Sequence, residues 1–180
     1  MRVSKEKAAQ NRENILTSAA RLFREHGIGA TGVDSITEDA GLTHGGLYSQ
    51  FGSKEAIAAE AVRLALANSQ HLWQRLAERK DGKKVFPTIV AQYLSAAHRD
   101  AAGRGCVIAA LGSEIARQPR RVRDSFTREF KNSLDFLAER ADRGCRRCCG
   151  GEPGLQPVPD LIEAVNIKAI SHRGDRKSVV

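Results

Sequence analysis

The chain has 180 residues and a mass of 19.6 kDa, which fits one compact unit or two small helical modules and excludes a large multidomain enzyme. Hydrophobic residues make up 41% and charged residues 28%, proportions near globular averages that argue against wholesale disorder. No apolar run approaches the roughly 20 residues that a membrane-spanning helix needs, and residues 1–12 are too polar for a secretory signal. We therefore expect a cytoplasmic protein with no membrane partner.

The net charge of +8 is compatible with nucleic-acid binding, because basic surfaces attract phosphate backbones. Residues 1–100 carry 14 basic and 11 acidic side chains, and residues 101–180 carry 15 and 10. Since the excess is not concentrated in one segment, charge alone does not decide the function. The four cysteines are expected to be reduced thiols in a chain with no export signal.

Helical periodicity dominates the chain, and signals for strands are nearly absent. Residues 4–26 place apolar side chains at the three-and-four spacing of an amphipathic helix, which Gly27 can end. Thr31 followed by Asp34 resembles a capping box and predicts a short second helix over residues 33–40.

Two further helices are predicted on either side of a tight turn. Gly41 ends the second helix, and Thr43 is a suitable N-cap for a third that runs to about Gln50. Ser53 can cap a long fourth helix over residues 54–79. Three short helices therefore precede one long helix.

The pattern continues after a polar break at residues 80–84. Pro87 suits the first turn of a fifth helix, which residues 103–105 interrupt. Residues 106–117 predict a sixth helix and residues 120–141 a seventh with one apolar stripe.

The composition then changes sharply. Residues 144–159 are rich in cysteine, glycine and proline, a composition that we expect to prevent a helix, and only residues 160–170 regain a helical pattern. Cys145, Cys148 and Cys149 resemble one half of a zinc site, but the second half is missing. We therefore predict no metal and no cofactor.

The most informative segment is residues 41–57, GLTHGGLYSQFGSKEAI. Two short helices joined by a tight glycine turn form a helix-turn-helix, whose second helix can enter the major groove of DNA by its N-terminal end. Thr43 and His44 stand at that end, whereas Leu47 and Phe51 must face the core.

This segment resembles the signature of the TetR family of bacterial repressors, through Gly41, Thr43, Gly45, Leu47, Tyr48, Phe51, Ser53, Lys54, Glu55 and Ile57. The resemblance is strong over about residues 15–62. It implies an all-α protein with a helix-turn-helix DNA-binding domain over residues 1–53 and a helical effector-binding and dimerisation domain over residues 54–143. Residues 144–180 would be an atypical, shortened tail.

The resemblance implies a ligand-responsive transcriptional repressor, not an enzyme, that binds a palindromic double-stranded operator as a homodimer. The candidate DNA-binding residues are Thr31, Thr43, His44, Gly45, Gly46, Tyr48 and Lys54. Tyr48 and Lys54 could contact phosphates, and Thr43 and His44 could contact base edges.

Paired glycines disfavour a helix, so Gly45 and Gly46 suggest a close approach by DNA or by a neighbouring helix. The basic residues Arg2, Lys5, Lys7 and Arg12 could form a DNA-binding arm, although a solvated helix start explains them at least as well.

The effector half offers large side chains as candidate pocket walls: Trp73, Phe86, Tyr93, Cys106, Phe126 and Phe130. Core packing explains each of them equally well. Cys106 opens a predicted helix beside Arg104, a position that favours a reactive thiolate, but a buried structural cysteine is the more common role of such a residue.

Two alternatives remain open beside the main prediction. One is a truncated or frame-altered regulator deficient in dimerisation, since the tail supplies at most one short helix. The other is a thiol-based sensor of electrophiles or oxidants that acts through Cys106.

Overall fold

The computed structural model describes residues 4–79 and 82–148, and over these residues every regular element is a helix. The helices are α1 (Lys5–His26), α2 (Val33–Asp39), α3 (His44–Phe51), α4 (Lys54–Arg79), α5 (Gly82–Tyr93), α6 (Ala96–Asp100), the 3₁₀ turn η1 (Ala102–Arg104), α7 (Val107–Ile115) and α8 (Arg120–Cys148). The predicted all-α fold is confirmed.

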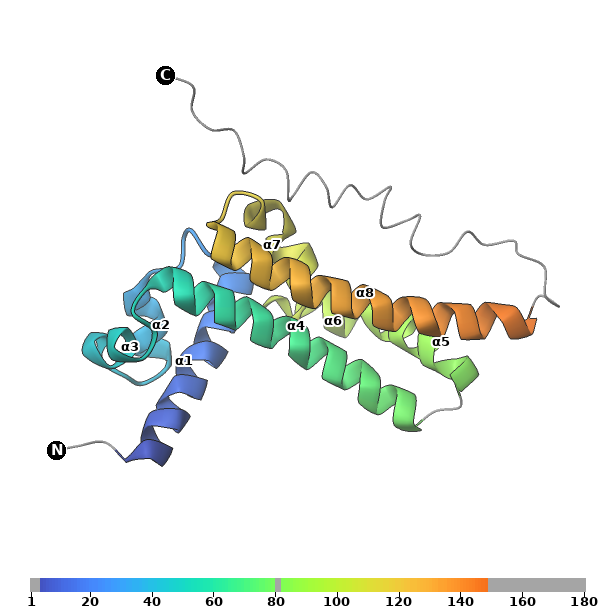
Figure 1. Ribbon diagram of the computed structural model, residues 1–180, viewed down its shortest axis with the longest axis horizontal. Coiled ribbons are helices and arrows are strands. Elements are labelled where there is room, and N and C mark those ends of the chain that lie inside the picture. The colour runs from blue at the N-terminus through green and yellow to red at the C-terminus, as the bar shows by residue number, and fades with distance from the viewer. Residues whose placement is uncertain (1–3, 80–81, 149–180) are drawn as a thin grey trace, which may run out of the picture.

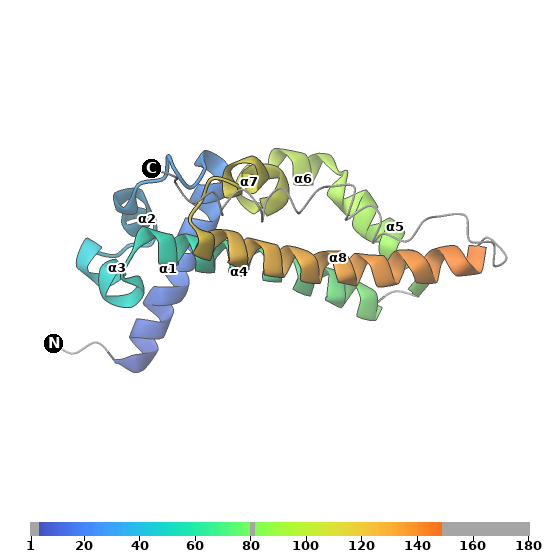
Figure 2. The same cartoon turned by 45° about the horizontal axis from the view of Figure 1, so that its top comes forward.

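The long helices α4 and α8 lie side by side and form the body of the molecule (Figure 1). Helices α1, α2 and α3 gather at one end of this pair, where α4 begins. Helices α5, α6 and α7 return along one side of α8 toward that end (Figure 2). The chain therefore brings α7 against α1. Glu114 of α7 contacts Ile28, in the loop after α1, which lies 86 positions earlier in the sequence.

One main core joins most of the molecule. It contains buried side chains from α1, α2, α3, α4, α7 and α8, with Ile15, Ile36, Leu47, Ile57 and Ile115 fully excluded from solvent. A smaller cluster of Val85, Ile89 and Phe136 holds α5 against α8 and the distal half of α4. Because α4 contributes to both clusters, the expected boundary at residue 53 is not a break in the core.

The predicted ends of the first helices agree with the structure. The Ser4 hydroxyl accepts a hydrogen bond of 3.2 Å from the Lys7 amide and caps α1. Gly27 and Gly41 follow α1 and α2 with φ angles of 87° and 65°, values that favour glycine because it has no Cβ. These turns orient α3 relative to α1.

Two predicted caps do not form. The N-cap of α2 is Gly32, with no side-chain hydrogen bond, so Thr31 and Asp34 make no capping box. Thr43 is the N-cap of α3 by position, but its hydroxyl makes no capping bond. Thr31 and Asp34 have other partners, described below.

The prediction for the fifth helix was wrong in two respects. Helix α5 begins at Gly82, so Pro87 lies inside the helix rather than in its first turn. The helix also ends at Tyr93, because the Ser95 hydroxyl accepts a hydrogen bond from the His98 amide and caps a separate helix, α6. The break separates α5 from α6, which is followed directly by η1.

The seventh predicted helix is longer than expected. Helix α8 continues through Gly144 to Cys148, because one glycine costs a helix only about 1 kcal/mol relative to alanine and the first proline of the tail is Pro153. The predicted helix over residues 160–170 and Cys149 lie outside the described residues. Across the described ranges, no helix is long and apolar enough to cross a membrane.

Candidate nucleic-acid interface and ligand groove

Helix α3 is anchored on one face and open on the other. Leu47 is fully buried and Phe51 is 9% exposed, as predicted. The Arg12 guanidinium lies 4.1 Å from the centre of the Phe51 ring, donates to the Gln50 carbonyl at 3.3 Å and pairs with Glu60 of α4. Arg12 therefore joins α1, α3 and α4 and is not part of a DNA-binding arm.

The leading end of α3 is exposed to solvent. Thr43, His44 and Gly45 are all exposed, and Tyr48 is 45% exposed. Neither the Thr43 hydroxyl nor the Tyr48 hydroxyl has a hydrogen-bond partner within the described part of the chain. These polar groups are therefore available to an external partner.

His44 is partly engaged by a residue that the sequence analysis did not select. Its Nε2 pairs with the Asp34 carboxylate of α2, and its ring centre lies 5.8 Å from that of Tyr48. The Asp34 side chain is 89% exposed, so a carboxylate stands at the rim of the candidate surface. The Asp34–His44 pair orients the imidazole at the start of α3.

The space around Gly45 and Gly46 of α3 tests whether these glycines allow a close approach by DNA or by a neighbouring helix. A Cβ added at Gly45 would meet nothing within 4 Å, and one at Gly46 would meet only the Thr43 Oγ1 at 3.6 Å, an ordinary contact. No described helix packs closely against either residue. The two glycines are therefore not needed for packing against a described helix, and a close approach by an external molecule is the explanation that is left.

Lys54 and Thr31 are less accessible than predicted. The Lys54 ammonium donates to the Gly29 carbonyl at 3.2 Å, beside the loop between α1 and α2. Thr31 is 3% exposed and its hydroxyl donates to the Gly27 carbonyl at 2.7 Å. The expectation that the Thr31 side chain contacts DNA is therefore wrong, because that side chain holds the α1–α2 loop from inside.

A second feature is an open groove of about 590 Å³. It is formed by the end of α5, by α6 and η1, and by the start of α7, with one residue from α1. Its walls are Arg24, Tyr93, Leu94, Ser95, His98, Arg99, Ala102, Gly105, Cys106, Ala109 and Ala110. A volume of this size is typical of small-molecule sites.

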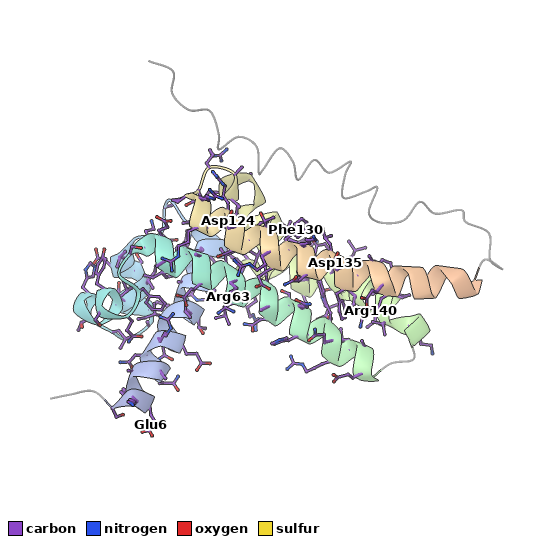
Figure 3. All side chains as sticks on the ribbon, in the orientation of Figure 1. Glu6, Arg63, Asp124, Phe130, Asp135 and Arg140 are labelled. Carbon is purple, nitrogen blue, oxygen red and sulfur yellow. The ribbon has the colours of Figure 1, made fainter. Side chains whose placement is uncertain are left out.

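Only two of the predicted pocket walls, Tyr93 and Cys106, line this groove. Phe126 is buried in the main core and its ring lies 5.7 Å from that of Phe130, which packs against the same core from α8 (Figure 3). Trp73 stacks on Phe136 with 6.3 Å between ring centres. Trp73, Phe126 and Phe130 therefore pack the interior, and Phe86 does not reach the groove.

Tyr93 and Cys106 interact at the wall of the groove. A hydrogen bond with Cys106, assisted by desolvation, raises the pKa of Tyr93 to about 12. The ring of His98 lies 4.7 Å from the Tyr93 ring. Cys106 is a free, half-buried thiol at the N-cap of α7.

Two contacts connect the groove side of the molecule to the helix-turn-helix end. The Arg24 guanidinium of α1 donates to the Gly103 carbonyl of η1, at 2.8 Å from Nε. The Glu114 carboxylate of α7 accepts from the Ile28 and Gly29 amides at 2.9 and 2.6 Å. Because Lys54 binds the Gly29 carbonyl, α7, the α1–α2 loop and the start of α4 form one network.

Within the side chains that the structure describes, no three histidine, cysteine or acidic residues converge on a possible metal position. The backbone of Cys145 and Cys148 belongs to α8, whereas their side chains and Cys149 lie outside the described part.

Comparison with known proteins identifies relatives of both the helix-turn-helix and the whole fold. Residues 15–61 match the family model of bacterial regulatory proteins, tetR family. The uncharacterized HTH-type transcriptional regulator YxaF of Bacillus subtilis is 31% identical over 68% of this chain and 65% of its own length. The HTH-type transcriptional repressor KstR2 of Mycolicibacterium smegmatis is 40% identical over 31% of this chain and 27% of its own. The chain thus spans less than two thirds of either relative.

A solved structure extends the similarity to the fold. The crystal structure of a TetR-family transcriptional regulator from Agrobacterium tumefaciens superposes with a TM-score of 0.72 over 93% of this chain and 90% of its own, at 20% identity. The names of these relatives describe regulators and not enzymes. Residues 15–61 therefore carry the helix-turn-helix of the tetR family of bacterial regulatory proteins, and the described helices share the fold of a solved TetR-family regulator.

Proposed function

We propose that the protein is a DNA-binding transcriptional repressor whose α3 helix enters the major groove. The observation that carries this proposal is the asymmetry of α3: Leu47 and Phe51 are buried, whereas Thr43, His44, Gly45 and Tyr48 form an open polar face. The glycine at position 45 leaves room that nothing in the described chain uses. Repression, as opposed to activation, is supported by the name of the KstR2 relative.

In this proposal some exposed residues position α3 on the DNA backbone and others read the base sequence. The Tyr48 hydroxyl and the Lys54 ammonium would contact phosphates, which fixes the orientation of α3 without reading sequence. Thr43 and His44 would meet base edges. Two copies of α3 in a homodimer would meet half-sites about 34–36 Å apart, which requires an inverted-repeat operator.

The proposed response to a ligand uses the network between the groove and the helix-turn-helix. Arg24 and Glu114 each join the α5–α7 side to α1 or to its following loop. A small molecule that changes the position of η1 or α7 would move α1 and therefore the spacing of the two reading helices. Such a ligand lowers DNA affinity only as far as it prefers the non-binding arrangement.

The test is selection of bound sequences from a random pool of duplex DNA, performed with the full chain and repeated with His44→Ala. Enrichment of an inverted repeat is expected, with altered base preference in the variant at the positions that His44 contacts. A pool without any enriched inverted repeat contradicts the proposal. An unchanged motif with His44→Ala removes only the reading role of that residue.

Sedimentation at micromolar concentration measures the oligomeric state and so distinguishes a dimeric repressor from the alternative, a regulator deficient in dimerisation. A dimer supports palindromic operator binding. A monomer at that concentration, with DNA affinity for a single half-site only, supports the deficient form instead.

A second candidate function is a thiol sensor, which the position of Cys106 in the groove wall beside Tyr93 favours. Alkylation of Cys106 with iodoacetamide is then expected to weaken operator binding, with Cys106→Ala, which retains Cys145, Cys148 and Cys149, as the control for alkylation elsewhere. Unchanged operator affinity after complete alkylation removes this function.

A further inference from the structure

The groove on the α5–α7 side is lined by positive charge and by no carboxylate. Its ionisable walls are Arg24, His98 and Arg99, together with the phenol of Tyr93 and the thiol of Cys106, and none of the described residues that line it is acidic. Asp100 neutralises Arg99 from outside the groove, with 2.6 Å between Nε and Oδ1. Of the two arginines that line the groove, Arg24 is therefore the one without an ion pair among the described residues.

Arg24 differs in this respect from Arg21, one turn earlier on the same helix. Arg21 pairs with the carboxylates of Glu25 and Asp39 at 2.5 Å each. The polar partner of Arg24 is instead the neutral Gly103 carbonyl, and within the described chain no carboxylate lies within ion-pair distance of it. Burial is the largest influence on the pKa of Arg24 and lowers it, while the charges of Glu25 and Cys106 act in the opposite direction without forming an ion pair with it.

The remainder of the groove is apolar and accessible. Leu94 is 76% exposed and Tyr93 is 44% exposed, so both side chains can be reached from solvent. Ala102, Ala109 and Ala110 continue this surface on η1 and α7. The groove thus combines a cationic end with small and aliphatic walls.

We propose that this groove binds a small amphipathic anion, whose negatively charged head group pairs with Arg24 and whose apolar part lies along Leu94, Ala109 and Ala110. The charge complementarity of the walls favours an anion over a neutral or cationic molecule, because a partly buried guanidinium gains most from an anionic hydrogen-bond acceptor. Binding itself is independent of DNA.

A regulatory consequence rests on the proposed function. An anion that hydrogen-bonds to the Arg24 guanidinium competes with the Gly103 carbonyl for the same donors. The bound state would therefore loosen η1 from α1 and change the position of the helix-turn-helix. In this arrangement Arg24 is the link between ligand and DNA-binding surface.

The test uses three probes with the same eight-carbon tail: octanoate, octan-1-ol and octylammonium. Calorimetric titration of the full chain at neutral pH is expected to give one octanoate per chain, bound about tenfold more tightly than octan-1-ol, a factor that corresponds to about 1.4 kcal/mol. Octylammonium should bind more weakly still. Equal affinities for all three probes would overturn the proposal.

Variants locate the site. Arg24→Gln should lower octanoate affinity about tenfold and leave octan-1-ol affinity unchanged, whereas Arg21→Gln, on the same helix but outside the groove, should leave both unchanged. Leu94→Asp is a second variant that leaves the Arg24–Gly103 hydrogen bonds in place. Because Leu94 is largely exposed, its replacement should not disturb the fold. This variant should weaken octanoate and strengthen octylammonium binding.

Failure of octanoate to bind the full chain, as expected if residues 149–180 or a second copy fill the groove, overturns the proposal. So does binding that neither Arg24→Gln nor Leu94→Asp changes. Because these titrations contain no DNA, their result is separate from the sequence-selection experiment. Loss of DNA binding and loss of octanoate binding can therefore be told apart.

Discussion

The helix-turn-helix end and the groove side use glycine in opposite ways. A Cβ at Gly45 of α3 would meet nothing within 4 Å. A Cβ at Gly103 of η1 would stand 2.2 Å from the Glu25 Oε1 and 2.7 Å from the Arg21 Cγ. Gly103 is therefore needed for a contact inside the protein, whereas Gly45 has no steric reason within the described chain.

This difference indicates which surfaces are complete in the isolated chain. The approach of η1 to α1 is closed by close packing and by the Arg24–Gly103 hydrogen bonds. On the open face of α3, the Thr43 hydroxyl and Gly45 have no such partner among the described residues, and His44 pairs only with the exposed Asp34, as expected of a surface shaped for an external molecule.

Removal of the Glu114 carboxylate should produce the largest loss of stability. Glu114→Ala leaves two loop amides of residues 28 and 29 without their acceptor, and hydrogen bonds to charged groups contribute roughly 1.5–3 kcal/mol each, less where water can replace them. We expect the free energy of unfolding in urea to fall by about 2 kcal/mol. Glu114→Gln, which keeps one acceptor oxygen, should lose about half as much. A loss within error of zero for both would show that α7 does not hold the loop.

Gly103→Ala should produce the next largest loss of stability. The added methyl group displaces the Glu25 carboxylate and the Arg21 stem, which costs about 1 kcal/mol in a tightly packed contact. The decrease should appear in the free energy of unfolding. Unchanged stability would show that η1 can move away from α1 without cost.

Gly45→Ala should change stability and DNA affinity in opposite directions. Replacing a helical glycine with alanine should stabilise α3 by about 1 kcal/mol, while the methyl group obstructs the approach of DNA and weakens operator binding about tenfold, or about 1.4 kcal/mol. Gly112→Ala of α7 is the matched control, because a Cβ there also meets nothing within 4 Å. Equal DNA affinity for both variants would show that Gly45 does not face DNA.

Asp34→Asn should have a smaller effect on DNA binding. The substitution removes a carboxylate from the rim of the α3 surface and releases His44 from its pair. Since an exposed charge pair contributes roughly 0.2–1 kcal/mol, we expect DNA affinity to rise about threefold at low salt. Asp135→Asn, at an exposed position along α8 (Figure 3), should have no effect. Weaker DNA binding by Asp34→Asn would mean that the pair must stay intact.

The smallest expected effect is a change in the pKa of Tyr93, in the wall of the groove. The chain has two tyrosines, so Tyr48→Phe leaves Tyr93 as the only source of tyrosinate absorbance. Its midpoint is expected at about pH 12, and Cys106→Ala should move it toward 10, the ordinary tyrosine value. A midpoint near 10 in both proteins, with helical circular dichroism retained, would contradict the contact.

The sign of this effect on stability follows from the raised pKa. The folded state favours the neutral phenol, so the contribution of Tyr93 is fully present below pH 10 and is lost as the pH rises toward 12. The difference in stability between wild type and Tyr93→Phe should therefore shrink over that interval.

The sequence was sufficient for α1 to α4 because their signals are local. Ser4, Gly27 and Gly41 mark helix ends within a few residues, and the burial of Leu47 and Phe51 follows from helical spacing. In contrast, the Arg24–Gly103 and Glu114–Ile28 contacts join residues 79 and 86 positions apart. No periodicity or motif encodes such pairs.

The pocket prediction failed for a different reason. Large aromatic side chains suit both cores and ligand sites, so size alone could not separate Phe126, in the main core, from Tyr93, in the groove. Asp34 was assigned to a cap because its sequence spacing fits one, and its pairing with His44 depends on the angle between α2 and α3.

The most direct test of the central claim is ultraviolet cross-linking to the selected duplex carrying 5-bromouracil at thymine positions, followed by mass spectrometry of tryptic peptides. The cross-link should fall in the peptide of residues 25–54, which contains His44 and Tyr48. Tyr48→Phe or His44→Ala should reduce its yield. A cross-link confined to the peptide with Trp73, or to the groove residues of α5, α6 and α7, would show that α3 does not contact the duplex.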